Sequence, residues 1–405
     1  MGKWLPVIVI WSLVDLQMVW GEATVRNTVE LSIEKRISGR TFPSVFQAWS
    51  GAENIKNEDK LTTVARHDLV FSSVGFFGLR WDNNYQGLAE GFTPESISKA
   101  VSLRKALLAR NPHIILLVEI RYRDAHPAFL PPNHRWWKRD ENGQLKMGWK
   151  EGGYIQLDFA NPQYRKHVVA RSRAAMRSGV VDGIMLDWWR EDEHRLKLLR
   201  AVREAVGDSA LIMVNANANR VPKSAGLVNG LFMECGAGMT SVHWAKIADT
   251  LVWAEQNLRR PHINGVETWY HQSRKDLNLM RATTALTLTL SDGYCLFSDP
   301  NPLPTHDHLH DWYSFWDKKL GKPISRGIKR KDGAVFREFE HGTAVYNPMG
   351  NELIVLSFND ERTSLACRKR SKVHSVSPGD GDIFLKDGET PKIQKCRRVE
   401  KLKPE

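Results

Sequence analysis

Short apolar runs recur along the chain and alternate with stretches of helical periodicity. The clearest is VDGIMLDWWRED, residues 181–192, where a buried-strand pattern ends abruptly at Asp187, two tryptophans and further charges. Two of the helical stretches also show their start, because Thr93-Pro94 and Asn161-Pro162 each place an N-cap residue before a proline. The pattern therefore predicts repeated β/α units.

Eight strand-like runs can be counted, most of them with a helix in between. They are PSVFQAWSGA, HDLVFSS with FGLRWD behind it, HIILLVEIRYRD, DGIMLD, ALIMVNANANR, GLFMECG, INGVETWY and DGYCLFSDP. This order is the one expected for a (β/α)₈ TIM barrel, an α/β fold. A doubly wound open sheet is the alternative, which is disfavoured because no glycine-rich phosphate loop follows the first strand.

The pattern changes after about residue 320, where strand-like runs alternate with Gly, Asn-Pro and Asp-Gly turns. We expect a small antiparallel, β-sandwich-like domain there. The predicted boundaries are residues 40–320 for the barrel, 322–394 for the C-terminal β domain and 395–405 for a basic tail. Inside the barrel, a long segment rich in Pro, Gly and aromatic residues follows the third strand, and loops of that length are usually functional.

The N-terminus combines Lys3, an apolar run and small residues near Ala23, which is typical of a secretory signal peptide at residues 1–23. An uncleaved anchor or an apolar extension is the alternative. Later stretches fall short of the ~20 consecutive apolar residues that span a bilayer. We therefore expect a secreted or extracytoplasmic protein without stable membrane insertion after signal removal.

Cysteines and charge narrow the function classes. The four cysteines are far apart, which argues against a zinc knuckle; Cys367 and Cys396 could pair in an oxidising compartment, whereas Cys235 and Cys295 fall on barrel strands as buried thiols. The net charge of +12 is concentrated late in the chain, which favours a solvated tail over a nucleic-acid site. An acidic polymer remains an open alternative.

Polar side chains stand at the ends of the predicted strands, and a closed barrel would bring these ends together on one face. Glycoside hydrolysis needs two carboxylates, one to protonate the leaving oxygen and one to attack the anomeric carbon or activate water. The strand-end candidates are Trp49, Asp82, Glu119, Arg121, Asp187, Asn215, Asn217, Glu234, Glu267 and Asp299.

Three of these are the catalytic candidates. Asp187, at the end of the clearest strand, is the first choice for the nucleophile; the alternative is that it caps the following helix. Glu234 leaves an apolar strand for a glycine-rich turn, an environment that raises a carboxyl pKa and suits a general acid. A strand-end salt bridge would also explain Glu234, and an ion pair with Arg121 would explain Glu119.

The remaining candidates concern substrate binding. Short polar side chains at strand ends fit hydroxyl recognition, and Asp192 joins them. The chain has 15 tryptophans, and an excess of this residue is typical of carbohydrate or interface sites; the alternative for each is core packing. The tryptophans predicted to face a sugar ring are Trp136, Trp137, Trp188 and Trp189.

Other chemistries have weaker support. No H-x-H follows the first strand and no G-x-S-x-G occurs, which argues against metal amidohydrolases and serine hydrolases. His306, His308 and His310 form a metal-like spacing, but alternating histidines in a loop are more often solvated. We expect no metal and no cofactor.

Together the motifs VEIRYRDA, WWKRDENGQ, LDFANP, DGIMLDWW, MVNANANR and HGTAVYNP resemble glycoside-hydrolase-like barrel families, distantly similar to the α-amylase and α-galactosidase groups. The resemblance implies a nucleophile at Asp187. The α-galactosidase-like groups place the acid/base after the sixth strand, which implies Glu234 although those relatives usually have Asp. The α-amylase-like groups use a Glu after the fifth strand, where this chain has Asn215 and Asn217.

We therefore expect a glycoside hydrolase, retaining in mechanism, that acts on an α-linked or unusual poly- or oligosaccharide. Two alternatives remain: a carbohydrate-binding barrel without catalysis, and a basic-surface binder of acidic polysaccharide. The expected partner is a carbohydrate and not a nucleic acid.

Overall fold

The computed structural model describes residues 30–235, 240–269, 273–299, 308–317 and 319–386. Its centre is a parallel sheet of eight strands, to which β11 (Leu309–His310) adds antiparallel to the last. A bridge between Val45 and Cys295 joins the last parallel strand to the first and closes the barrel. The predicted (β/α)₈ barrel is confirmed. Its strands are β1 (Phe46–Ala48), β2 (Leu69–Ser72), β3 (Ile115–Glu119), β6 (Gly183–Leu186), β7 (Leu211–Asn215), β8 (Gly230–Cys235), β9 (Gly265–Trp269) and β10 (Tyr294–Asp299).

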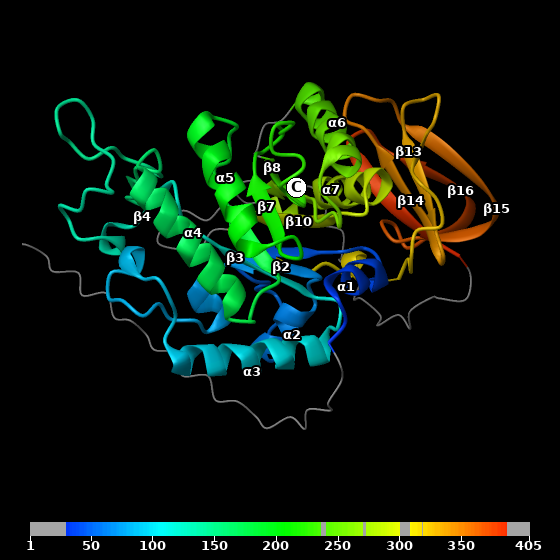
Figure 1. The fold of residues 1–405 in the computed structure, drawn as a ribbon. Helices are drawn as coiled ribbons and strands as arrows, with labels where there is room; N and C mark the ends of the chain where they lie inside the picture. Colours follow the sequence, from blue (N-terminus) through cyan, green and yellow to red (C-terminus); the bar gives the residue numbers. More distant parts are fainter. Residues whose placement is uncertain (1–29, 236–239, 270–272, 300–307, 318, 387–405) are drawn as a thin grey trace, which may run out of the picture.

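Helices cover the outside of the barrel (Figure 1). Thr93 accepts a hydrogen bond from the Ser96 N–H at the start of α3, and Asn161 caps α4 in the same way, so both predicted helix starts are confirmed. The first helix, α1, has no counterpart in the sequence prediction. The helices are α1 (Ile33–Gly39), α2 (Lys60–Ala65), α3 (Pro94–Arg110), α4 (Pro162–Arg177), α5 (Glu193–Val206), α6 (Ser241–Asn257) and α7 (Leu277–Leu290).

Three phenylalanines fill the barrel beneath the strand ends. The rings of Phe46, Phe71 and Phe232 lie 5.0–5.8 Å apart between centroids, and all three are buried. Because β1 and β8 are not neighbours in the sheet, Phe46 and Phe232 can meet only across the barrel interior. Close strand packing also explains Gly183, where an added Cβ would lie 2.0 Å from the Leu211 carbonyl oxygen. The interior of the barrel is therefore filled by side chains below the carboxyl ends of the strands.

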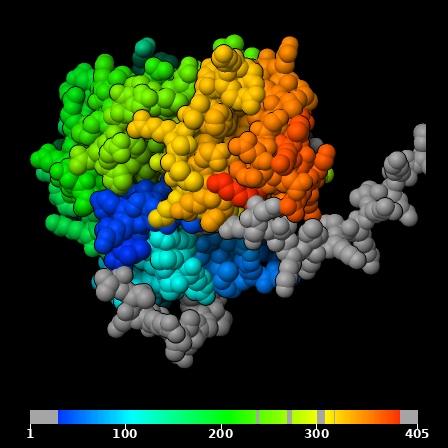
Figure 2. Space-filling model, turned by 90° about the vertical axis from the view of Figure 1, so that its right-hand side faces the viewer, coloured from blue at the N-terminus to red at the C-terminus, as the bar shows by residue number. Residues whose placement is uncertain are grey.

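The C-terminal segment forms a six-stranded antiparallel sheet, as predicted. The sheet packs against α7, where Arg281 pairs with Asp380 at 2.6 Å. Figure 2 shows the C-terminal segment directly beside the barrel. The domain boundaries themselves stay predictions. The strands are β12 (Ile328–Lys329), β13 (Val335–Phe339), β14 (Gly342–Asn347), β15 (Ile354–Ser364), β16 (Arg370–Val376) and β17 (Asp380–Leu385).

Several sequence predictions fall outside the described residues: the signal peptide, the basic tail, His306 and the pairing of Cys396. Cys235 and Cys295 are buried free thiols, as predicted. Among the helices in the described ranges, none is both long enough and apolar enough to cross a membrane.

Candidate active site

Asn215 connects the two first-choice catalytic carboxylates. It ends β7, which lies between β6 and β8, the strands that carry Asp187 and Glu234. Its amide nitrogen Nδ2 donates to Asp187 Oδ1 at 2.8 Å and to Glu234 Oε2 at 3.0 Å. Because one nitrogen lies this close to both oxygens, the two oxygens are at most about 5.8 Å apart. Strand order alone thus brings the predicted pair together.

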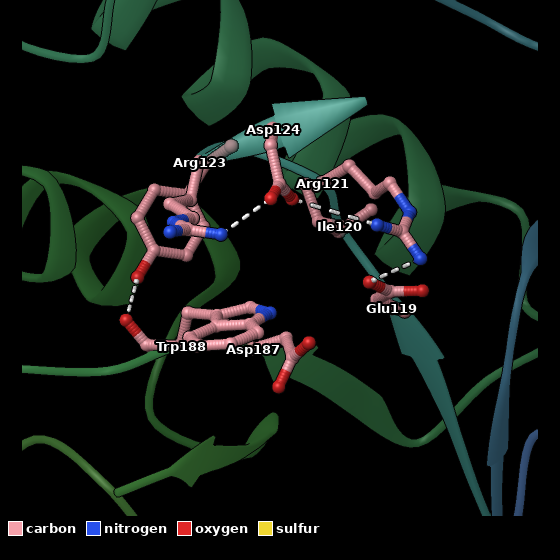
Figure 3. A pocket seen from close by; sticks show the side chains of 8 residues that line it. Glu119, Ile120, Arg121, Arg123, Asp124, Asp187 and Trp188 are labelled. Atoms are coloured by element: carbon pink, nitrogen blue, oxygen red, sulfur yellow. Dashed lines mark hydrogen bonds and ion pairs between the residues drawn. The ribbon is translucent and has the colours of Figure 1, made fainter. Parts of the chain in front are cut away.

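Glu119 lies on the other side of Asp187, at the end of β3. The indole N–H of Trp49 donates to its Oε2 at 2.9 Å, and the Arg121 guanidinium lies 3.3 Å from its Oε1. Figure 3 shows Glu119, Arg121, Asp187 and Trp188 lining one small pocket. Three carboxylates, from β3, β6 and β8, therefore share one edge of the barrel.

The two carboxyl groups bound by Asn215 have different affinities for protons. Burial raises the pKa of Glu234 to about 7; the charge of His308 opposes this rise, and the charge of Asp187 adds to it. Burial also raises the pKa of Asp187 to about 6, helped by the charge of Glu119 and opposed by Arg121. Between these two values, Asp187 is mainly ionised while Glu234 is mainly protonated, which is the division of labour between a nucleophile and a general acid.

Backbone strain marks the same edge. Left-handed φ values are uncommon for residues other than glycine, and they gather at functional sites because surrounding contacts must hold them. Of the five such residues in the described parts of the chain, only Arg368 lies outside the barrel, in the turn between β15 and β16 of the C-terminal sheet. The other four follow barrel strands: Trp49 (φ 49°), Trp188 (φ 54°), Asn217 (φ 50°) and His308 (φ 59°).

His308 is a site residue that the sequence prediction missed. The expectation that His308 and His310 are solvated is wrong, since both are buried. The ring of His308 packs 4.7 Å from that of Trp49, and its Nδ1 lies 2.8 and 2.9 Å from the two carboxylate oxygens of Glu267. Its Nε2 lies 3.8 Å from Glu234 Oε1. The alternating spacing of the histidines did not predict these contacts, because Glu234 and Glu267 are both distant from His308 in the sequence.

Within the residues that the structure describes, the same three side chains form a group whose donors could hold a metal ion. One ligand atom each from Glu234, Glu267 and His308 lies within 4.8 Å of the others. The donor set, two carboxylates and one imidazole, would suit a divalent cation. The Glu267 oxygens instead accept hydrogen bonds from the His308 ring and the Ser298 hydroxyl, so His308 Nδ1 carries a hydrogen and is not available as a metal ligand.

Three predicted sugar platforms are corrected, because their rings are in the core. Trp189 is buried and its indole N–H donates to Ser224 Oγ at 3.2 Å. Trp137 is buried and donates to the Pro131 carbonyl, while Trp136 packs on Tyr164 of α4. None of these three rings has a face open to a ligand.

The predicted hydroxyl-binding residues also divide. Asp192 is corrected: it is the N-cap of α5, accepting from the Arg195 N–H at 3.0 Å, and this also excludes the alternative that Asp187 caps that helix. Asp82 is corrected as well, because β2 ends at Ser72 and Asp82 lies exposed on the loop beyond.

Two further candidates lie at strand ends with protein partners. Asp299 ends β10 and is paired with Arg274 at 2.9 Å. The exposed Asn217 donates its backbone N–H to Asn215 Oδ1 at 3.2 Å. This contact orients the Asn215 amide so that its nitrogen faces the carboxylates.

The long segment after β3 forms a wall of the site. It begins with β4 (Asp124–Ala125), which pairs with β5 (Ile155–Gln156), and Tyr154 beside β5 packs 4.7 Å from the Arg121 guanidinium. Arg123 pairs with Asp124 and stacks 4.3 Å over the ring of Trp188, which is 45% exposed. Trp188 is thus the accessible ring among the four predicted sugar platforms.

Solved structures resemble the chain in fold. No family model and no curated protein sequence matches it. A noncanonic maltogenic α-amylase from Thermotoga neapolitana matches with a TM-score of 0.51 and 11% identity, over 84% of this chain and 96% of that one. An α-amylase from Lactobacillus plantarum matches with a TM-score of 0.49 and 10% identity, over 87% and 99% of the two chains. The chain therefore has an α-amylase-like fold, as its motifs predicted.

Proposed function

We propose that this protein is a retaining glycoside hydrolase in which Asp187 is the nucleophile and Glu234 the acid/base. The observation that carries the proposal is the shared Asn215 amide, which keeps the facing oxygens within about 5.8 Å. Retaining enzymes hold their carboxyl groups about 5–5.5 Å apart, whereas inverting enzymes leave about 6.5–9.5 Å for a water molecule. The short separation supports a covalent intermediate.

In the proposed first step, Glu234 donates its proton to the glycosidic oxygen while an Asp187 oxygen bonds to the anomeric carbon, and the glycosidic bond breaks. In the second step, Glu234 takes a proton from water as the water oxygen replaces Asp187. Asn215 holds both carboxylates through the cycle. Trp188 offers its open face to a pyranose ring beside Asp187.

The substrate we propose first is an α-linked poly- or oligosaccharide. The reason is the fold shared with a maltogenic α-amylase, together with a nucleophile on the same, fourth barrel strand that the resemblance implies. A panel of α- and β-linked glycans, with products followed by chromatography, identifies the sugar and linkage. NMR of the first-formed anomer then separates retention from inversion.

The deciding experiment compares Asp187→Asn and Glu234→Gln with Asp192→Asn on this panel. Asp192→Asn is a matched control, because Asn also caps helices well and the residue lies on the same loop outside the carboxylate cluster. We expect the control to retain activity and both site variants to lose about a hundredfold or more. Undiminished turnover in both site variants would rule out the assignment.

A second comparison separates Glu234 from Glu119 as the acid. An activated aryl glycoside has a leaving group that needs no proton. Loss of the true acid therefore spares the first step on this substrate, whereas loss of the nucleophile does not. We expect Glu234→Gln to keep far more activity on aryl glycosides than on natural glycans. If Glu119→Gln shows that behaviour and Glu234→Gln does not, the roles are exchanged.

A carbohydrate-binding barrel without catalysis is the second candidate. The observation in its favour is Asn215, which stands after the fifth strand where the α-amylase-like groups have their acid/base Glu. This candidate requires glycan affinity that falls in Trp188→Ala, with no cleavage by the wild-type protein on any glycan of the panel.

A further inference from the structure

His308 lies between two carboxylates that belong to neighbouring strands. On one side is Glu267 of β9, fully buried, whose two oxygens lie 2.8 and 2.9 Å from Nδ1. On the other side is Glu234 of β8, with Oε1 3.8 Å from Nε2. The ring cannot turn freely, because Trp49 packs against its face and the backbone at His308 is held at φ 59°.

The contact with Glu267 fixes the tautomer of the imidazole. A carboxylate accepts hydrogen bonds and does not donate them, so Nδ1 must carry a hydrogen to contact both oxygens. The Ser298 hydroxyl donates to the same carboxylate and helps to hold it. Nε2 is then the ring atom that gains or loses a proton, and it is the atom that faces Glu234.

We propose that His308 is a positioning residue for the acid/base, anchored by Glu267 and controlling the proton on Glu234. The inference rests on the proposed function for the role of Glu234. While Glu234 is protonated, neutral His308 leaves it able to act as the acid. When Glu234 is ionised, a protonated Nε2 stabilises its carboxylate by charge. The catalytic proton still passes from Glu234 to the leaving oxygen and returns from water, so His308 consumes no proton in the cycle.

Other titratable groups also act on this unit. Asp187 reaches Glu234 through Asn215, and their charges repel. The Cys235 thiol is buried beside Glu234 and Glu267, and these neighbours raise its pKa further beyond the effect of burial. His310 acts on His308 by charge from β11. These neighbours are the same in the wild-type protein and in a Glu234 variant, so a difference in titration between the two reports the Glu234 side chain.

The test is a pH titration of full-length protein labelled with ¹⁵N-histidine, followed by NMR. The His308 signals are identified by their absence in His308→Gln. We expect a neutral form with its hydrogen on Nδ1, and a titration midpoint that falls by about one pH unit or more in Glu234→Gln, because an attractive charge within about 4–6 Å is lost. Glu193→Gln is the matched control: this exposed glutamate on α5 should leave the midpoint unchanged.

Two results would overturn the proposal: an identical His308 midpoint in wild type and Glu234→Gln, or a neutral form with its hydrogen on Nε2. The measurement needs no substrate. Inactivity on every glycan would therefore remove the proposed function while leaving this test intact, and an unchanged titration would remove the role of His308 alone.

Activity gives a second readout. In His308→Gln, the alkaline limb of the kcat/KM profile should move to higher pH, because the imidazolium no longer lowers the pKa of Glu234. A merely structural role would reduce kcat/KM equally at every pH and contradict the proposal.

Discussion

The two ends of strand β6 carry the same residue type in opposite environments. Asp182, at the amino end, is buried and paired with Arg36 and with Arg104, the latter at 2.6 Å, and it accepts the Leu116 N–H at 2.8 Å. Asp187, at the carboxyl end, accepts an amide hydrogen from Asn215 and lies among carboxylates.

The contrast shows how the barrel separates stability from chemistry. At the amino end, the Asp182 carboxylate is paired with two guanidinium groups and a backbone N–H. Because Arg36 belongs to α1 and Arg104 to α3, these ion pairs fix both helices against the barrel. At the carboxyl end, Asp187 shares Arg121 with Glu119, and the pKa values of Asp187 and Glu234 rise because burial is incompletely compensated. A group that is costly to ionise is the one available for reaction.

The largest expected difference is in turnover. Asp187→Asn should lower kcat about a thousandfold or more, because an amide cannot form the glycosyl ester. Asp182→Asn should leave the kcat of the folded fraction within about threefold, since its partners lie at the far end of the barrel. Circular dichroism and urea unfolding of each variant, alongside steady-state kinetics, separate the folded fraction from kcat. Equal losses in the two variants would abolish the distinction between the two ends.

The next largest effect is on stability, and here we expect the amino end of β6 to matter more than the carboxyl end. Asp182→Asn should lower the free energy of unfolding by about 3 kcal/mol, because two buried guanidinium groups lose their carboxylate. The matched control is Asp208→Asn, whose pair with Arg259 is at the surface, with the Asp208 side chain 84% exposed. That variant should change stability by less than about 0.5 kcal/mol. Urea unfolding measures both; a control as unstable as Asp182→Asn would contradict the comparison.

The carboxyl end should also set a narrow pH profile. The reactive form has Asp187 ionised and Glu234 protonated, so kcat/KM should be highest between about pH 6 and pH 7. It should fall about tenfold per pH unit on either side. With an activated aryl glycoside, Glu234→Gln should lose the alkaline limb and keep the acidic one. An alkaline limb that persists in this variant would assign it to another group.

The smallest effect is a gain in stability. Because the pKa of Asp187 is higher in the folded state, folding favours its protonated form. The ionised side chain therefore lowers the free energy of unfolding. This loss is absent below the ordinary pKa near 3.8 and grows as the pH rises to about 6. Asp187→Asn should therefore stabilise the protein by about 1 kcal/mol at neutral pH and much less near pH 4. Chemical unfolding at both pH values tests this; a gain independent of pH would point to packing instead.

Local patterns predicted the fold well because strands and helix caps are local. Thr93-Pro94 and Asn161-Pro162 identified helix starts from adjacent residues alone. Helix α1 was missed because it is short and is held by the ion pair of Arg36 with Asp182, which is distant in sequence.

The site was predicted in part for the same physical reason. Asp187 and Glu234 were brought together by strand order, which the sequence contains. His308 was missed because its burial depends on Glu267 of another strand. Trp189 was misplaced because two adjacent tryptophans give no indication which ring faces the core, and here Trp188 is exposed and Trp189 buried.

The most direct test of the Asp187 assignment is covalent trapping. A 2-deoxy-2-fluoro glycoside with an activated leaving group, made from the sugar that the glycan panel identifies, slows hydrolysis of a glycosyl ester. Mass spectrometry of the tryptic peptide 178–190, which contains both Asp182 and Asp187, then locates the sugar. We predict one glycosyl group, on Asp187. A glycosyl group on Glu119 or Glu234, or inhibition without any covalent sugar, would contradict the role of Asp187 as nucleophile.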